Sequence, residues 1–174
     1  YDLASVAKRY VNKEDFVRAS QVEQPFEATA ADLAILEDKS HYRVANFNVN
    51  PLNDGSTSYF HKSIGGYHAA KPRRYQELFD YQIAHNNFEV LNMLHTKYII
   101  GTGQQGETQV QVNDQSYGNA WFVNEIAWVK TADEEIKALD SLYKNKAVIN
   151  EIYKKIIPEN VGKIDSTASI QLEK

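Results

Sequence analysis

The sequence contains no cysteine and only one methionine among its 174 residues. The absence of cysteine excludes a thiol nucleophile, a thiolate zinc site and any disulfide. No apolar run approaches the roughly 20 residues that span a bilayer, so we expect this polypeptide to be soluble as it stands. The formal net charge of −4 argues against general nucleic-acid affinity, and we expect no nucleic-acid partner.

The composition is that of a globular chain, with 43% hydrophobic and 24% charged residues. These fractions exclude disorder, collagen and a coiled coil. A chain of this length buries roughly 70% of the surface that its unfolded form exposes. It can therefore form a hydrophobic core without disulfides or a bound metal. It is long enough for one domain, or at most for two small ones.

The pattern of apolar residues and caps predicts an α+β fold. Helices are predicted to start at Thr29, at Pro72, near Asn87 and at Thr131. Strands are predicted at 42–47, 98–100, 109–112, 120–129 and 147–149, and a long loop at 56–70. We expect a mixed, mainly antiparallel sheet that includes 42–47, 98–100 and 120–129, with the Pro72 and Thr131 helices packed on it.

The last eight residues alternate between polar and apolar side chains, as a strand does. We therefore expect an α+β domain over 1–162, and over 163–174 the start of a further β-region that belongs to a longer protein. Residues of this last stretch are expected to be poorly packed, because their sheet partners would lie beyond residue 174.

The segment 55–76 is unusual because it contains no acidic residue in a chain that is acidic as a whole. Its cations and histidines are His61, Lys62, His68, Lys71, Arg73 and Arg74, and its aromatic residues are Tyr59, Phe60, Tyr67 and Tyr75. Cations interleaved with aromatic rings suit an anionic or sugar-bearing ligand. The alternative is a solvated basic loop whose aromatic residues belong to the core.

The start of the Pro72 helix is predicted to be an anion site. Arg73 and Arg74 fall in its first turn, where the helix macrodipole disfavours cations. We assign the charge to Arg73, Arg74 and Lys62, a hydrogen bond to His61 or His68, and a sugar contact to Tyr59 or Tyr67. The alternative is that both arginines pair with carboxylates such as Glu77 or Asp80.

No motif in the sequence predicts catalysis, a metal or a cofactor. His61 and His68 lack a third ligand at metal-binding spacing, and no Gly-x-Ser-x-Gly elbow exists. The glycines at 101, 103 and 106 lack the Lys-Ser/Thr of a phosphate loop and suit a hairpin. We therefore expect no catalytic residue, no metal and no cofactor in this chain.

Five blocks of sequence carry a resemblance to a known family. They are KRYVN at 8–12, NDGSTSYFHKSIGGYH at 53–68, KPRRYQ at 71–76, LNMLHTKYII at 91–100 and GNAWFV at 118–123. In this combination and order the chain resembles YfhO-type bacterial membrane proteins, in the version of Bacteroidetes members. That family consists of multi-span proteins related to the GT-C glycosyltransferases, which use polyprenyl-phosphate sugar donors outside the cytoplasmic membrane.

The resemblance implies an extracytoplasmic portion, on the periplasmic side of the inner membrane, of such a glycosyltransferase-like protein. Its partners would be the membrane-embedded remainder of the same polypeptide and a lipid-linked sugar phosphate or envelope glycan. No position here matches the loop that holds the GT-C catalytic carboxylates. We expect an accessory domain that contacts the ligand without catalysing alone. The alternatives are a structural module that docks on the membrane helices through the Tyr59–Tyr75 surface and, less favoured, an independent glycosidase.

Overall fold

The computed structural model describes residues 2–157, 167–170, 172 and 173. Its helices are α1 (Asp2–Tyr10), α2 (Ala19–Glu23), α3 (Ala30–Leu36), α4 (Ser56–Phe60), α5 (Arg73–Tyr81), α6 (Phe88–Met93) and α7 (Ala132–Ala138). Its strands are β1 (Arg43–Asn46), β2 (Thr96–Thr102), β3 (Thr108–Val112), β4 (Glu125–Val129) and β5 (Lys146–Asn150). Short 3-10 turns lie at Lys13–Asp15, Ile83–His85, Leu139–Ser141 and Glu151–Tyr153. This α+β composition confirms the predicted fold class.

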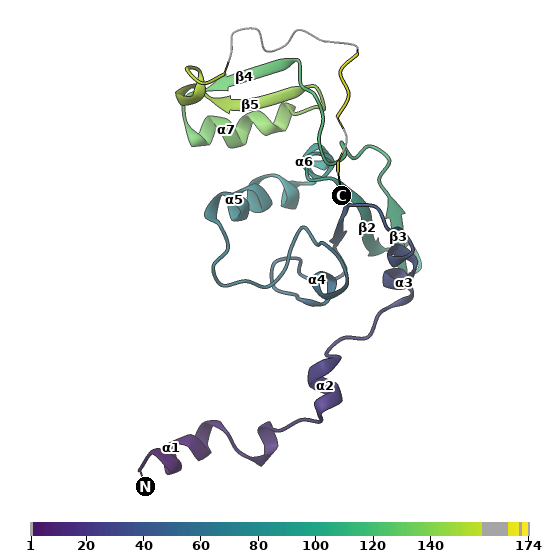
Figure 1. Ribbon diagram of the computed structural model, residues 1–174, viewed down its shortest axis with the longest axis vertical. Helices are drawn as coiled ribbons and strands as arrows, with labels where there is room; N and C mark the ends of the chain where they lie inside the picture. The colour runs from purple at the N-terminus through teal and green to yellow at the C-terminus, as the bar shows by residue number, and fades with distance from the viewer. Residues whose placement is uncertain (1, 158–166, 171, 174) are drawn as a thin grey trace.

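The strands form two sheets, as Figure 1 shows. In the three-stranded sheet, central β2 pairs parallel with β1 and antiparallel with β3. In the second sheet, β4 and β5 pair parallel. Two of the three described strand pairings are therefore parallel, whereas the sequence pattern predicted a mainly antiparallel sheet.

The predicted strand 120–129 needs a correction in length and in place. Only Glu125–Val129 is extended in a ladder, and it pairs with β5 rather than with the sheet that holds β1 and β2. An apolar run specifies a buried strand but not its partner, because the partner is chosen by residues distant in sequence. The predicted strand at 147–149 is confirmed as β5 and supplies that partner.

The three-stranded sheet is covered on both faces, and the alternation of side chains along β1 and β2 assigns each residue to one face. On one face, Ala45 and Ile99 pack with apolar residues of α5, α6, the loops beside them and the turn after α7: Ile64, Phe79, Ile83, Val90, Leu91 and Leu142. On the other face, Val44 and Ile100 pack with Ile35 of α3 and with Tyr42. The result is a helix–sheet–helix arrangement.

The outer edge of β1 is protected by the segment that follows α4. The Val44 N–H donates to the Lys62 carbonyl at 2.9 Å, and the Ile64 N–H donates to the Val44 carbonyl at 3.0 Å. This contact has the geometry of a parallel bridge between Val44 and Ser63. Residues 62–64 thus hold the middle of the segment between α4 and α5 against the sheet.

Polar side chains join α5 and α6 to the unit made of α7, β4 and β5. The buried Gln82 amide donates to the Ile136 carbonyl at 2.7 Å and to Asp140 at 3.0 Å. The Asn87 amide donates to Gln82 at 2.6 Å and to the Leu139 carbonyl at 2.9 Å. Because these groups are satisfied by one another, α7 is held alongside α5.

The predicted domain boundary at residue 162 lies outside the described residues. The described residues that follow it are exposed and form no strand, and Ile170 and Leu172 are exposed by 50% and 62%. Within the described part of the chain, no helix has the length and the hydropathy needed to cross a membrane.

Candidate functional site

The acid-free segment begins with a helix where the sequence predicted a loop. In the turn before α4, the Asp54 carboxylate accepts hydrogen bonds from the Ser56 N–H, at 2.9 Å, and from the Ser56 hydroxyl. Thr57 is buried, and its hydroxyl accepts from the Asn46 amide at 3.0 Å. The five-residue helix carries no readable apolar period, so the local cap and one buried threonine determine it.

Two glycines let the loop after α4 approach the 50–54 turn. The Gly66 N–H donates to the Pro51 carbonyl at 2.6 Å, with Gly66 at φ +129°. A Cβ on Gly65 would lie 1.9 Å from that carbonyl oxygen. Side chains are excluded at this contact for steric reasons, and only glycine permits the approach.

A cavity of about 450 Å³ opens beside this contact and the start of α5. It is lined by Leu52, Ser58, Gly65, Gly66, Tyr67, His68, Ala70, Lys71, Pro72 and Tyr75. Among these lining residues, all of them described, there is no carboxylate, although the chain has 23 acidic residues. The cavity therefore combines concave shape with positive charge.

The polar side chains of the cavity are held by hydrogen bonds, and Lys71 and His68 keep further N–H donors for a ligand. The Lys71 ammonium donates to the Leu52 carbonyl at 3.3 Å, which occupies one of its three donors. The His68 Nδ1 accepts from the Ala70 N–H at 3.0 Å, so its hydrogen lies on Nε2. The Tyr75 hydroxyl donates to the Ile64 carbonyl, and burial raises the pKa of Tyr75. Lys71 and His68 can thus donate to an anionic oxygen while Tyr67, 73% exposed, offers a ring.

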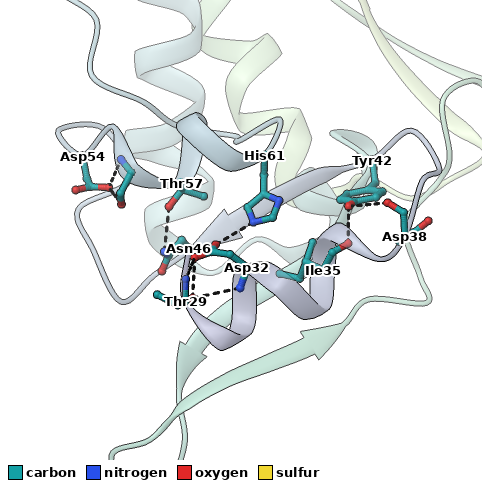
Figure 2. A network of polar contacts seen from close by, with 10 residues as sticks. Thr29, Asp32, Ile35, Asp38, Tyr42, Asn46, Asp54, Thr57 and His61 are labelled. Atoms are coloured by element: carbon teal, nitrogen blue, oxygen red, sulfur yellow. Dashed lines mark hydrogen bonds and ion pairs between the residues drawn. The ribbon is translucent and has the colours of Figure 1, made fainter. Parts of the chain in front are cut away.

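His61 lies elsewhere: it is buried and faces α3. Its Nε2 lies 2.9 Å from Asp32, and its side chain is 1% exposed (Figure 2). The other Asp32 oxygen accepts from the Thr29 N–H at 2.8 Å and from the Thr29 hydroxyl at 2.7 Å. These contacts clamp the end of α4 to the start of α3, so His61 is placed for a structural role rather than for the predicted ligand contact.

The Asp32 carboxyl remains acidic in this clamp. Burial alone would raise its pKa, but the Thr29 hydrogen bonds, the His61 hydrogen bond and the charge of His61 together lower the pKa below its ordinary value of 3.8. The ionised carboxylate is therefore the form that holds the Thr29 cap and the His61 ring.

Tyr59 and Lys62 also lie outside the residues that line the cavity. The Tyr59 ring, 48% exposed, meets the rings of Phe26 and Phe60 edge to face, at 5.5 and 4.9 Å between centroids. The Lys62 side chain is exposed, and it is the backbone carbonyl of Lys62 that contacts β1. The predicted set of ligand residues is thus divided, with Tyr67 and His68 in the cavity.

Arg73 and Arg74 occupy the first turn of α5, as predicted, but they pair with carboxylates. Arg73 Nε lies 2.7 Å from Glu77, and an Arg74 nitrogen lies 2.9 Å from Glu135 of α7. Both arginine side chains are highly exposed, at 91% and 77%. These pairs are the alternative to an anion site, and because water screens exposed ion pairs, they add little to stability.

A larger groove of about 610 Å³ lies between α5 and α7 on the Arg73 side. Its charged lining residues are Arg73, Lys137, Glu77, Asp133 and Asp140, two cations against three carboxylates. The Arg73 groove is thus polar and concave, but its lining carries one carboxylate more than it carries cations.

Lys71 and Tyr75 are the site residues that sequence reasoning did not select. Both lie in the acid-free segment, and this lack of acidic residues was the sequence feature that could have pointed to them. Their position in the cavity depends on the Gly65–Pro51 approach, a contact that no local pattern specifies. Among the described residues, no group of His, Asp or Glu side chains has the arrangement to hold a metal ion. In comparisons with known proteins, the chain matches no family model, no curated protein and no solved structure.

Proposed function

We propose that this chain is an accessory, extracytoplasmic portion of a multi-span, glycosyltransferase-like membrane protein of the YfhO type. In this proposal it lies on the periplasmic side of the inner membrane and works with the membrane-embedded part of the same polypeptide. It contacts the phosphate and sugar of a lipid-linked donor, or an envelope glycan, and does not catalyse alone. The five blocks quoted above support the family, and the cavity supports the contact.

The single observation that carries the ligand contact is the acid-free cavity beside Lys71. A phosphate oxygen is an acceptor that suits an ammonium and an imidazole N–H, and a sugar ring suits an aromatic face. Lys71, His68 and Tyr67 supply these three features around one space of about 450 Å³. A volume of this size accommodates a sugar phosphate head group.

The same cavity argues for binding rather than for hydrolysis. Glycoside hydrolysis in most families needs two carboxyl groups, one on each side of the scissile bond. The described lining of the Lys71 cavity offers neither. We therefore favour a ligand-contacting role over an independent glycosidase.

A second candidate function is a structural module that docks on the parent's membrane helices. The observation that favours it is the exposure of Tyr59 and Tyr67, by 48% and 73%, on the Tyr59–Tyr75 surface. Exposed aromatic rings of this kind are typical of protein contacts. In that case the cavity would be a by-product of the loop path and would bind no phosphate.

Calorimetric titration with glucose 1-phosphate and with inorganic phosphate tests the ligand contact. We expect saturable binding of the sugar phosphate, weakened about ten- to a hundredfold by Lys71→Gln, because a hydrogen bond to a charged group contributes about 1.5–3 kcal/mol. The matched control is Lys62→Gln, an exposed lysine of the same segment that does not line the cavity, and it should bind as the native chain does. Equal loss in both variants, or no binding by the native chain, would favour the docking module.

A further inference from the structure

The N-terminal part of the chain exposes apolar side chains that the rest of the molecule does not cover. Figure 1 shows α1 and α2 extending away from the two sheets. On and just after α1, Leu3 is 85% exposed, Val6 46%, Tyr10 79% and Val11 58%. Several large apolar side chains exposed to water along one short segment indicate a surface that a membrane or another molecule covers.

The apolar and cationic residues of α1 lie on different faces. Leu3, Val6 and Tyr10 stand at positions i, i+3 and i+7, which share one face of a helix. Lys8 and Arg9 lie in the last turn, and the helical period places Lys8 on the opposite face and Arg9 at the border of the apolar face, beside Val6. Long cationic side chains in this position can reach past an apolar layer to the charged groups at its surface.

The charge of this segment differs in sign from that of the chain. From Asp2, the first residue of α1, to Lys13 there are three cations, Lys8, Arg9 and Lys13, against one carboxylate, Asp2, although the whole chain has a net charge of −4. Two further carboxylates follow at Glu14 and Asp15. Positive charge therefore adjoins the apolar face of α1, with Lys8 and Arg9 on the helix and Lys13 just after it.

We propose that residues 3–13 bind the interface of an anionic lipid bilayer, with α1 lying parallel to the surface. Leu3, Val6 and Tyr10 would enter the boundary between head groups and acyl chains, and Lys8, Arg9 and Lys13 would contact lipid phosphates. An amphipathic helix with aliphatic and aromatic residues on one face and cations on the other has the chemistry of such an interfacial segment. This membrane contact is independent of the proposed ligand cavity, which lies in the segment from Leu52 to Tyr75.

Co-sedimentation of the full chain with vesicles tests the proposal. The probes are vesicles of phosphatidylcholine alone and of equal parts phosphatidylglycerol and phosphatidylcholine. We expect binding to the anionic vesicles that decreases as salt is added. Lys8→Gln with Arg9→Gln should lower the partition coefficient about thirtyfold, since each cation contributes about 1 kcal/mol. The matched control, Lys144→Gln with Lys155→Gln, removes two exposed cations outside residues 3–13 and should lower the partition coefficient far less.

A second pair of variants tests the apolar face. Leu3→Ala with Tyr10→Ala should weaken binding about tenfold or more, because both side chains leave the apolar layer. Phe16→Ala with Val22→Ala removes exposed apolar groups of the N-terminal segment that lie outside residues 3–13, and it should leave vesicle binding unchanged. Equal binding to both vesicle types, equal loss in tested and control pairs, or self-association of the chain without vesicle binding would overturn the proposal.

Discussion

The Lys71 cavity and the Arg73 groove flank the start of α5 and place neighbouring cations in opposite electrostatic surroundings. Lys71 lines a cavity with no carboxylate among its described residues. Arg73, two residues later, lines a groove with three carboxylates and pairs with one of them at 2.7 Å. We therefore propose the anion site beside Lys71, where the fold keeps carboxylates away from the cation, and not beside Arg73.

The largest effect we expect comes from the wall that shapes the Lys71 cavity. Gly65→Ala places a Cβ 1.9 Å from the Pro51 carbonyl oxygen, so the backbone of the loop or of the turn must move. We expect a loss of about 3 kcal/mol in the free energy of unfolding, measured by urea titration. Gly55→Ala is the control, because a Cβ there meets nothing within 4 Å. Equal stability of the two variants would show that the cavity wall is not rigid.

The next effect concerns the Asp32 clamp between α3 and the end of α4. Asp32→Asn removes the charge that holds the Thr29 cap and His61, and should cost about 2 kcal/mol at neutral pH. Because the folded pKa of Asp32 lies below its unfolded value, the native chain should lose this advantage as the pH falls below about 4. Urea unfolding of the native chain and of Asp32→Asn from pH 7 to pH 3 measures this difference in the free energy of unfolding. A difference that stays constant over this range would contradict the ionised clamp.

A smaller effect should appear when the Arg73 groove is changed to resemble the Lys71 cavity. Glu77→Gln with Asp133→Asn removes two of the three carboxylates that line this groove, one of them the partner of Arg73. We expect the affinity for inorganic phosphate at this groove to rise about three- to fivefold, close to 1 kcal/mol. Glu27→Gln with Glu37→Gln changes the net charge equally at exposed positions and is the control. An equal rise in both proteins would mean that net charge alone is responsible.

The smallest effect is expected for a single arginine of the groove. Arg73→Gln loses an ion pair with Glu77 but also removes a cation from the positive end of α5. Since the two changes oppose each other and the side chain is 91% exposed, the free energy of unfolding should stay the same within the error of the measurement. A clear fall of the urea midpoint would show that this ion pair is a structural contact.

The local parts of this structure could be predicted from the sequence. Helix starts at Thr29, Asn87 and Thr131 are set by a side chain that accepts from a backbone N–H two or three residues later. The core strands β1 and β2 were predicted from their own apolar residues. Each of these features depends on neighbours in the chain, which a sequence displays directly.

The division of the candidate site could not be predicted in the same way. His61 is removed from the ligand set by Asp32, 29 residues earlier, and Arg74 is neutralised by Glu135, 61 residues later. Tyr59 packs on Phe26 of the N-terminal arm. The acid-free segment was the correct signal for a positive cavity, but contacts distant in sequence decide which of its residues face that cavity.

Amide NMR of the native chain during titration with glucose 1-phosphate tests the central claim most directly, because it locates the bound anion. The account predicts that the shifts concentrate at Gly65, Gly66, Tyr67, His68 and Lys71, and that the amides of α7 stay unchanged. Shifts that concentrate instead on the Arg73 groove, at Glu77, Asp133 and Lys137, or no shifts at saturating ligand, would contradict it.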